Sequence, residues 1–492
     1  MNHCARRQTL LSLGLAVIAL RAVSAQSAPA ISEARIRADM AVLASDSFAG
    51  RKPGTLGERL TTAFIIGRLT AAGVVPANGG AWLQPLALEV RRMRSARLTV
   101  RAADASVMDL SGDVAMVAAS SSLTLVGLDV RDAAYVGDAG AAVGADSHHC
   151  GVLALYRDAD PPELRQPQPT DALTRLANLG RAGTCGALAI VADDVFLRRK
   201  AAFDEGVATL VSDPGLVVRG IIRESAARRV LAASGPLTAD LEVVTEVASV
   251  TSHNVIGILR GAARPDEYLL YTAHWDGFGR CRPGEADEIC NGAIDNASGT
   301  AGLLELARAF AGGPRPDRSV VFLFTTAEEM GLAGSREYAR RPVVPLARTM
   351  AAFNLDVIAL YPRGNTVGFV GAGLTDADSV FARLAAAQGR TLDSGPLTRM
   401  VLRSSDMWSL LMAGVPAFIL SGAIGGSPSG TPAFRDYLAT RYHGPEDELL
   451  DDLPMGGAAE EVELLYAVGR HFGGAGTSVT FMPGSTFQRV AH

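Results

Sequence analysis

The chain has 492 residues, roughly three times the length of a typical single domain, so the sequence predicts two or three domains. Its 46 Lys and Arg residues against 51 Asp and Glu residues give a formal net charge of −5, and this balance excludes the basic footprint of a nucleic-acid-binding protein. Hydrophobic residues make up 48% of the chain and the 52 glycines follow no repeat, which argues against disordered and fibrous architectures.

Residues 1–25 have the pattern of an export signal. Arg6 and Arg7 precede an apolar run over residues 10–20, and small residues follow up to Ala25. An uncleaved membrane anchor is the alternative, but the run is short against the roughly 20 residues that cross a bilayer. The adjacent arginines also leave a twin-arginine export route open. The sequence therefore predicts a periplasmic or secreted protein with no membrane contact after cleavage.

Four cysteines remain after this cleavage, and an even number in an oxidising compartment predicts disulfide bonds. Cys281 and Cys290 flank a short loop that closes at little entropic cost, and we expect them to pair. Cys150 and Cys185 are the second candidate pair. Free thiols are the alternative for both pairs. A four-thiolate zinc site is disfavoured because the sequence contains no Cys-x-x-Cys spacing.

Residues 26–110 predict two helices and then an extended segment, which we assign to the N-terminal part of the main domain. The apolar residues of each helix recur at helical spacing, and residues 51–57 between the helices have the composition of a loop. The predicted buried faces are Ile36, Met40, Leu43 and Ala44 in the first helix and Leu60, Phe64, Ile65 and Leu69 in the second.

Residues 111–244 have a different sequence pattern, which predicts a separate β-rich domain. Short β-branched runs, such as residues 152–156 and 187–191, alternate there with glycines. One helical stretch is expected at residues 172–181.

Residues 245–480 show a regular alternation of strands and helices, before a short tail at 481–492. Two apolar runs of strand length enclose a segment with helical spacing, and this βαβ pattern predicts a parallel arrangement. We therefore expect an α/β fold with a mixed, largely parallel sheet and helices on both faces. The expected strands are residues 268–272, 319–324, 353–358 and 415–420, and the expected helices lie around Leu303–Phe310, 377–388 and 460–472.

His, Asp and Glu residues lie at the end of the candidate strands and in the loops of this region, where the reactive groups of a parallel sheet collect. One such residue alone is usually structural, so the coincidence within one unit is what points to a site. Two histidines with several carboxylates form a ligand mix that suits zinc or a similar divalent ion. The candidate residues are His274, Asp276, Asp295, Glu328, Glu329, Asp356 and His443.

The spacing of two pairs has a chemical meaning. In an extended segment, His274 and Asp276 share a face, so the carboxylate can hold the imidazole in its metal-ligating tautomer. The adjacent Glu328 and Glu329 point different ways, one toward a metal and one toward the water that it activates. A carboxylate general base beside a metal-bound water is the pair expected for hydrolysis.

Five motifs occur in a fixed order: Ala273-His-Trp-Asp-Gly277, Gly292-Ala-Ile-Asp-Asn-Ala-Ser-Gly299, Thr326-Ala-Glu-Glu-Met-Gly331, Asn354-Leu-Asp356 and Tyr442-His443-Gly-Pro-Glu-Asp. Together they resemble the co-catalytic dizinc aminopeptidases of the M28 peptidase family. The segments Gly50-Arg-Lys-Pro-Gly-Thr-Leu-Gly57 and 254–257 extend this resemblance over most of the mature chain. The resemblance implies the zinc exopeptidase fold.

The resemblance also implies roles for the candidate residues. The implied ligands are His274 and Asp356 for one zinc ion and Glu329 and His443 for a second, with Asp295 bridging the two. Glu328 would be the general base, and Asp276 would orient His274. Two metals about 3.5 to 4 Å apart could share a hydroxide and polarise a scissile carbonyl. No ligand position is substituted, which argues against a catalytically inactive relative.

Three segments match the family less closely. Ser405-Asp406 resembles a family segment in which His commonly follows, but Met407 stands here, which leaves a substrate or supporting role for this segment in doubt. The charged loop 280–290 is either a disulfide-closed surface loop or a specificity device. Residues 111–244 resemble, chiefly through residues 174–191, the protease-associated domain inserted into many of these peptidases. Two roles are open for this region, that of a lid over the active site and that of a passive structural insert.

Other enzyme classes lack their motifs in this sequence. There is no His-Glu-x-x-His, no Gly-x-Ser-x-Gly and no P-loop, which excludes zincins, serine hydrolases of that type and P-loop nucleotide hydrolases. A glutaminyl-cyclotransferase-like relative would use one metal, whereas this sequence keeps the five ligand positions for two. The resulting hypothesis is an exported zinc aminopeptidase that removes the N-terminal residue from peptides. A carboxypeptidase of the same fold and a non-catalytic zinc-binding protein are the alternatives.

Overall fold

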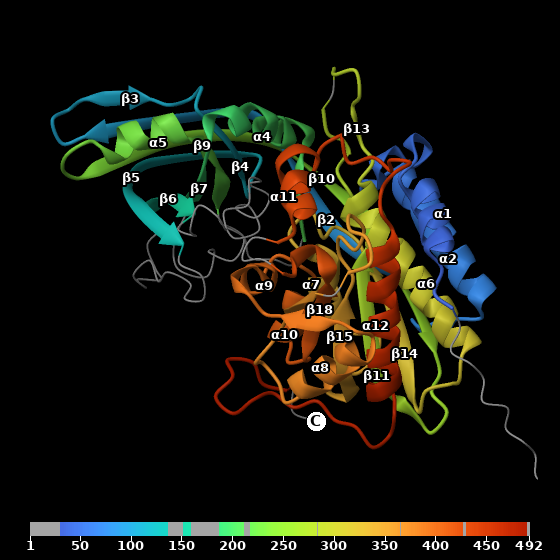
Figure 1. The fold of residues 1–492 in the computed structure, drawn as a ribbon. Coiled ribbons are helices and arrows are strands. Elements are labelled where there is room, and N and C mark those ends of the chain that lie inside the picture. The colour runs from blue at the N-terminus through green and yellow to red at the C-terminus, as the bar shows by residue number, and fades with distance from the viewer. Residues whose placement is uncertain are drawn as a thin grey trace, which may run out of the picture.

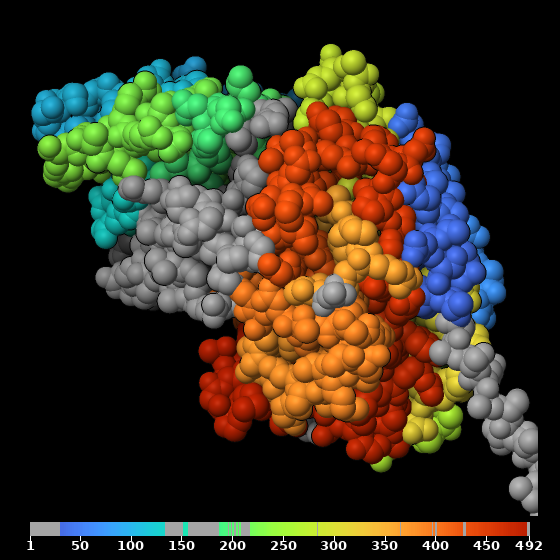
Figure 2. All heavy atoms as spheres, in the orientation of Figure 1, coloured from blue at the N-terminus to red at the C-terminus, as the bar shows by residue number. Residues whose placement is uncertain are grey.

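The computed structural model describes residues 30–135, 151–158, 186–210, 217–282, 284–364, 366–426 and 430–489. The predicted export signal, the candidate pair of Cys150 with Cys185 and the helix expected at 172–181 lie outside these residues. Within them, no helix combines the length and the apolar character needed to span a membrane. The described chain forms a main body and a smaller lobe beside it, as the ribbon in Figure 1 and the cyan and green atoms in Figure 2 show.

Most strands belong to one large sheet that runs through both parts, and the two others, β12 and β13, form a separate hairpin. The strands of the large sheet are β1 Val75–Pro76, β2 Leu83–Ala102, β3 Val107–Asp109, β4 Val114–Ala118, β5 Ser122–Tyr135, β6 Val152–Asp158, β7 Gly186–Val191, β8 Val207–Leu210, β9 Val218–Arg223, β10 Leu237–Leu259, β11 Arg264–His274, β14 Arg318–Thr325, β15 Thr349–Asn354, β16 Thr366–Val370, β17 Thr391–Asp393 and β18 Ala417–Ser421. The hairpin strands are β12 Gly279–Arg280 and β13 Ile289–Cys290.

The helices of the main body precede, interrupt and follow its strands. They are α1 Glu33–Leu43, α2 Leu56–Ala72, α6 Gly299–Gly312, α7 Ala333–Arg340, α8 Asp378–Ala387, α9 Pro396–Val401, α10 Met407–Met412, α11 Pro432–Thr440 and α12 Gly456–Phe472. The small lobe contains α4 Asp193–Glu205 and α5 Glu224–Leu231. Short helical turns occur at η1 Asp46–Arg51, η2 Ala293–Ser298, η3 Leu346–Arg348 and η4 Gly422–Ile424.

The main body is built on the strand order β17-β16-β18-β15-β11-β14-β10. β11 pairs in parallel with β14 and β15, β15 with β18, and β16 with β17, while β10 runs antiparallel to β14 and β16 antiparallel to β18. Every residue of β14 is buried, as expected for a strand covered on both faces. Helices α2, α6 and α12 pack on one face and α7 and α10 on the other. The predicted α/β fold with a mixed, largely parallel sheet is confirmed.

A long antiparallel ribbon of β2 and β10 connects the main body to the small lobe. Its pairing is continuous from Leu83 opposite Val255 to Ala102 opposite Leu237, with one irregularity at Val244. The C-terminal part of β10 pairs with β14 in the main body, and its N-terminal part pairs with β5 in the small lobe. The two parts of the molecule therefore share two uninterrupted strands.

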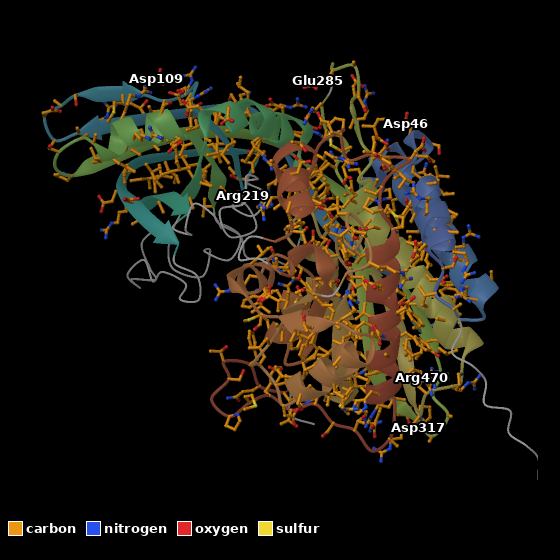
Figure 3. All side chains as sticks on the ribbon, in the orientation of Figure 1. Asp46, Asp109, Arg219, Glu285, Asp317 and Arg470 are labelled. Carbon is orange, nitrogen blue, oxygen red and sulfur yellow. A yellow bond between two sulfur atoms is a disulfide. The ribbon has the colours of Figure 1, made fainter. Side chains whose placement is uncertain are left out.

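The small lobe has hydrophobic clusters of its own, separate from that of the main body. Its strands β5, β6, β7 and β9 pair in parallel, and α4 and α5 pack against β9. Leu98 and Val100 lie in its core, although the sequence places residues 26–110 in the main domain. Figure 3 shows Asp109 in this lobe and Asp46 and Asp317 at opposite ends of the main body. The likeness to a protease-associated domain stays a prediction.

Two elements differ from the sequence-based expectations. The prediction of a strand at 353–358 is wrong for the residues after Asn354, because β15 ends there. The N–H groups of Val357 and Ile358 donate to side chains of η2 instead of a neighbouring strand, and Val357 has a φ of 53°. In α2, Leu60 and Phe64 are only partly buried, because Thr61 and Thr62 take the buried face.

Candidate metal centre

Neighbouring parallel strands bring the candidate ligands to one edge of the main sheet. β11 ends at His274, Glu328 and Glu329 follow β14, and Asp356 follows β15. Because β11 pairs in parallel with both β14 and β15, the carboxyl ends of the three strands meet. His443, in the loop after α11, joins them from outside the sheet.

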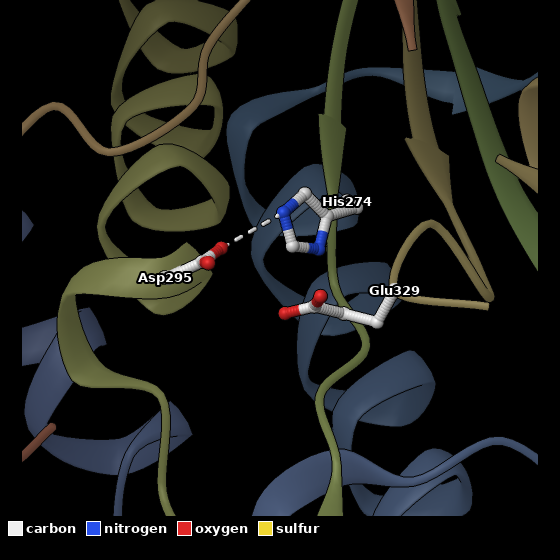
Figure 4. Close-up of side chains that lie close together, drawn as sticks. All are labelled: His274, Asp295 and Glu329. Carbon is white, nitrogen blue, oxygen red and sulfur yellow. Dashed lines mark ion pairs between the residues drawn. The ribbon is translucent and has the colours of Figure 1, made fainter. Parts of the chain in front are cut away.

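Asp295 lies between the two histidines of the group. Its Oδ1 is 3.1 Å from His274 Nε2, and its Oδ2 is 3.1 Å from His443 Nε2. Asp356 Oδ1 is 3.5 Å from His274 Nε2, and Glu329 Oε2 is 3.2 Å from His443 Nε2. Figure 4 shows Asp295 and Glu329 both directed toward the ring of His274. One carboxylate therefore faces both imidazoles, and each imidazole also faces a second carboxylate.

Asp276 and Glu328 also lie close to His274. Asp276 is fully buried, and its Oδ1 lies 3.7 Å from His274 Nδ1 and accepts the backbone N–H of Glu328 at 3.0 Å. Glu328 forms a close group with His274 and Asp356, whereas Glu329 forms one with His274 and Asp295. The two adjacent glutamates thus take part in different groups of potential ligands.

The sequence analysis missed the side chains that hold η2 and its Asp295 in place. Asp447 accepts the backbone N–H groups of Ile294 and Asp295 with its two carboxylate oxygens, both at 3.0 Å. Asn296 donates to the carbonyl of Leu355 at 3.0 Å, which ties η2 to the segment that leads to Asp356. Asp447 and Asn296 lie in two of the motifs quoted above, and that position was the only signal for them.

Asp406 contacts the end of β14, next to the candidate ligands, whereas Met407 is not one of the residues that gather around His274. Asp406 is fully buried and accepts a hydrogen bond from the hydroxyl of Thr325, the last residue of β14. Met407 begins α10 and lies in the hydrophobic core of the main body. The position at which this sequence departs from the family pattern is therefore a core position here.

Burial and charge act against each other in this group. Burial opposes a protonated imidazole, yet the carboxylates around it, that of Glu328 foremost, raise the pKa of His274 well above its ordinary value. Burial would raise the pKa of Asp295, but His274 and His443 hold this pKa below its ordinary range. Burial raises the pKa of Glu329 to about 7. The side chains thus create a buried field of negative charge, which favours a bound cation.

The donor set fits a divalent metal ion. Imidazole nitrogens together with carboxylate oxygens are the ligands that zinc takes in catalytic sites. Two sets of three donors have ligand atoms within 4.8 Å of one another, namely His274, Asp295 and Glu329, and His274, Glu328 and Asp356. The buried Oε1 of Glu329 has no hydrogen-bond partner among the described residues. A buried carboxylate oxygen in that position is stabilised when a cation engages it.

The loop between the first two ligand segments is closed by a disulfide bond. Cys281 and Cys290 are joined, as predicted, with their Cα atoms 5.7 Å apart. Arg282 Nη1 is 2.6 Å from Glu446 Oε1, and Cys290 Sγ lies 3.5 Å from the carbonyl oxygen of His443. The disulfide-closed loop therefore packs against the segment that carries His443. Its role in specificity stays a prediction.

Comparison with known families assigns the part of the chain that carries this group. Residues 254–462, which include every candidate ligand, match the model of peptidase family M28. Residues 254–462 belong to peptidase family M28. The segment matched begins within β10 and ends within α12, so the M28 domain comprises the main sheet with the helices that follow it in the chain.

The M28 domain is similar in sequence to parts of longer curated proteins. The chain is 40% identical over 113 residues to Aminopeptidase NAALADL1 of Mus musculus, a match that covers 22% of this chain and 14% of the mouse protein. It is 36% identical over 124 residues to the Glutamate carboxypeptidase 2 homolog of Caenorhabditis briggsae, covering 24% of this chain and 15% of that protein. The chain therefore spans only about one seventh of the length of these relatives.

Solved structures resemble the chain over nearly its whole length. An aminopeptidase from Aneurinibacillus sp. strain AM-1 matches with a TM-score of 0.56 and 18% identity, over 94% of this chain and 97% of that one. BSAP, a zinc aminopeptidase from Bacillus subtilis, matches with a TM-score of 0.50 and 18% identity, over 91% of this chain and 96% of that one. At this level of identity the likeness establishes the fold.

Proposed function

We propose that the protein is an exported, zinc-dependent exopeptidase that removes the N-terminal residue from peptides. The observation that carries this proposal is the Asp295 carboxylate, whose two oxygens face one histidine each at 3.1 Å. A carboxylate shared between two imidazoles could serve two metal ions held about 3.5 to 4 Å apart. Export rests on the sequence of residues 1–25 alone.

The residues of the site divide between two metal positions. We assign His274 and Asp356 to one zinc ion, Glu329 and His443 to the other, and Asp295 to both. Bound zinc would supply Lewis-acid polarisation of the peptide carbonyl and would lower the pKa of water. The fully buried Asp276, close to His274 Nδ1, holds the imidazole with its Nε2 directed at the metal position.

Glu328 is the proposed general base. Burial raises its pKa well above the ordinary value for a carboxyl group, which brings it toward the range in which a side chain can both accept and return a proton. We propose that the Glu328 carboxylate removes a proton from the attacking water and delivers it to the nitrogen of the departing peptide. The backbone hydrogen bond from Glu328 to Asp276 fixes the start of this side chain.

A carboxypeptidase is the second candidate, because several sequence relatives, that of Caenorhabditis briggsae among them, bear the name of a glutamate carboxypeptidase. The names of the relative from mouse and of the solved structures favour the aminopeptidase. The two activities differ in which charged end of the peptide the enzyme binds.

The deciding experiment compares two substrate panels on the purified protein. Aminoacyl-nitroanilides offer a free amine, and N-blocked dipeptides offer a free carboxylate. Each panel is run with and without a zinc chelator, on the wild type and on Glu328→Gln, with zinc content measured in parallel. We expect chelator-sensitive release from the free-amine substrates only, and a loss of roughly 10²- to 10⁴-fold in Glu328→Gln at unchanged zinc content.

Other outcomes would change the proposal. Turnover of blocked dipeptides alone would assign the carboxypeptidase activity. Stoichiometric zinc binding without turnover on either panel would leave a non-catalytic zinc-binding protein. Full activity in Glu328→Gln would remove this residue from the role of base.

A further inference from the structure

Arg51 is a buried arginine that the proposed function leaves without a role. It ends η1, is 1% exposed and lies in the Gly50-Arg-Lys-Pro-Gly motif. Its backbone has a φ of 52°, a left-handed conformation that is unfavourable for a residue with a side chain. Both this strain and the burial of a cation require compensation from the surroundings.

The guanidinium of Arg51 receives this compensation from main-chain carbonyl groups. Its Nε donates to the carbonyl of Trp275 at 2.8 Å, and its Nη2 donates to Gly292 at 2.9 Å. Its Nη1 donates to Asn291 and, at 3.0 Å, to Leu43. Four donor–acceptor contacts therefore use most of the five N–H groups that an arginine carries.

Three of these carbonyls belong to the two segments that carry the proposed metal ligands His274 and Asp295. Trp275 stands between His274 and Asp276, whereas Asn291 and Gly292 precede Asp295. Arg51 thus connects the end of β11 to the start of η2 through one planar group. One guanidinium group therefore contacts both segments, next to His274 in one and three residues before Asp295 in the other.

The packing around Arg51 leaves little room for adjustment. A Cβ atom added to Gly50 would lie 2.7 Å from the carbonyl oxygen of Cys290 and from Gly279. A Cβ atom added to Gly292 would lie 2.9 Å from Nη2 of Arg51 and 2.3 Å from the carbonyl oxygen of Asp295. The backbone at Gly50 and at Gly292 therefore approaches its neighbours more closely than a residue with a side chain could, and at Gly292 one of these neighbours is the guanidinium itself.

Burial lowers the pKa of Arg51, while the nearby carboxylates, that of Asp447 foremost and then Asp276 and Asp295, act to raise it. The cation thus offsets part of the negative charge of the ligand group. It also repels a metal ion bound nearby. Loss of this positive charge would therefore strengthen metal binding when Arg51 is removed, whereas loss of the hydrogen bonds would weaken it.

We propose that Arg51 is a positioning residue that fixes the segments of His274 and Asp295 at the separation that binds zinc. The inference rests on the proposed function, in that it assigns the same side chains as zinc ligands. It requires that the loss of the guanidinium fork weakens zinc binding even where the positive charge is kept.

The test compares Arg51→Lys with Arg318→Lys. Arg318 is 2% exposed and also donates to main-chain carbonyls, those of Phe472 and Thr477 among them, at 2.9 and 3.0 Å. It starts β14, at the end of that strand remote from the ligands, next to Asp317 in Figure 3. The two substitutions remove the same kind of hydrogen-bonded group from two buried places of the main body, only one of which adjoins the metal centre.

The readouts are zinc affinity, by competition with chelators, and the visible absorption spectrum of the cobalt(II)-loaded protein, which reports the coordination geometry. Both are normalised to the folded fraction measured by circular dichroism. We expect Arg51→Lys to weaken zinc binding about 10- to 100-fold and to change the cobalt spectrum. We expect Arg318→Lys to lower the midpoint of thermal unfolding and to leave both metal readouts unchanged.

A second variant, Arg51→Met, separates geometry from charge. Weaker zinc binding in Arg51→Met supports the positioning role. Tighter zinc binding than in the wild type would mean that charge repulsion dominates, and would overturn the inference. Wild-type affinity and an unchanged cobalt spectrum in Arg51→Lys would overturn it as well. Because these readouts concern metal binding, a wild type that binds zinc without cleaving peptides would contradict the proposed peptidase activity and leave the inference on Arg51 intact.

Discussion

The main body and the small lobe both contain parallel strands with acidic residues near their ends, but within the described residues only the main body gathers them into a group of potential ligands. In the small lobe, Asp193 follows β7, is exposed and accepts the backbone N–H of Ser225 at 3.0 Å. Asp113, before β4, pairs with Arg223 at 3.1 Å and with Arg229 at 2.8 Å. Each of these carboxylates has its own partner at the surface.

The carboxylates of the main body are buried and share their partners. The Ser225 N–H lowers the pKa of Asp193, whereas burial raises the pKa of Glu329 to about 7. Parallel strands therefore bring polar side chains to one edge of a sheet, but this placement alone does not produce a metal-binding site. A metal centre also needs burial and more carboxylates than the surrounding donors can neutralise.

The strongest test of this comparison removes one carboxylate from each part. Asp295→Ala deletes the oxygen atoms that face both histidines, and we expect zinc retention to be lost and turnover to fall by roughly 10³-fold or more. Asp193→Ala is the control, and its cost is limited to the stability that the hydrogen bond to the N–H of Ser225 in α5 provides. Zinc content after dialysis and initial rates measure both. Full zinc content in Asp295→Ala would contradict the shared-ligand assignment.

A second test asks whether the two hydrophobic cores act separately. Phe353 of β15 and Phe196 of α4 are both fully buried, the first against the ring of Tyr271 with centroids 5.0 Å apart. Truncation of either to Ala should cost about 3 to 5 kcal/mol of unfolding free energy. Phe353→Ala should also weaken zinc binding, because β15 leads to Asp356.

Phe196→Ala should leave zinc affinity at the wild-type value. Thermal unfolding with and without zinc distinguishes the two variants, since a bound ion stabilises only the part that holds it. Equal loss of zinc affinity in both variants would show that the lobes unfold as one cooperative unit.

A third test concerns a buried carboxyl group in α12. Burial raises the pKa of Glu461 from 4.5 to about 8, and the hydroxyl of Tyr361 donates to it at 2.7 Å. Because folding raises this pKa, its contribution to stability is fully present below about pH 4.5 and is lost as the pH rises through about 8. Glu461→Gln should remove this loss, which amounts to about 1.4 kcal/mol for each pH unit within the window.

Urea unfolding at pH 5, 6, 7 and 8 measures this difference. Glu463→Gln is the matched control, since Glu463 lies on the same helix, is partly exposed and pairs with Arg363 at 3.1 Å. Parallel stability curves for the wild type and Glu461→Gln would contradict the prediction.

Much of the main body could be predicted from the sequence because its signals are local. The strands β11 and β14 are continuous apolar runs, and the helical spacing of Leu303 and Phe310 marks α6. The order of the polar residues after these runs was enough to name the candidate ligands. The hairpin disulfide followed from the short separation of Cys281 and Cys290.

What the sequence could not predict depends on contacts between distant segments. Val357 leaves the expected strand because side chains of η2, some 60 residues earlier, bind the backbone there. The four acceptors of Arg51 come from three different segments of the chain, so its motif gave no sign of its partners. The helices α4 and α5 of the small lobe were missed among short apolar runs that predicted strands.

The continuous ribbon of β2 and β10 has a consequence for how the chain folds. Leu83 and Val255 stand opposite each other where the ribbon joins the main body, although more than 170 residues separate them in the chain. The entropic cost of closing such a loop grows only with the logarithm of its length. A small lobe that folds first would already hold these two strands together. The helices α1 and α2, which precede β2 in the chain, would then lie close to the part of the main sheet that follows β10. In that order of events, the small lobe would hold β2 and β10 together while the main body folds around their other ends.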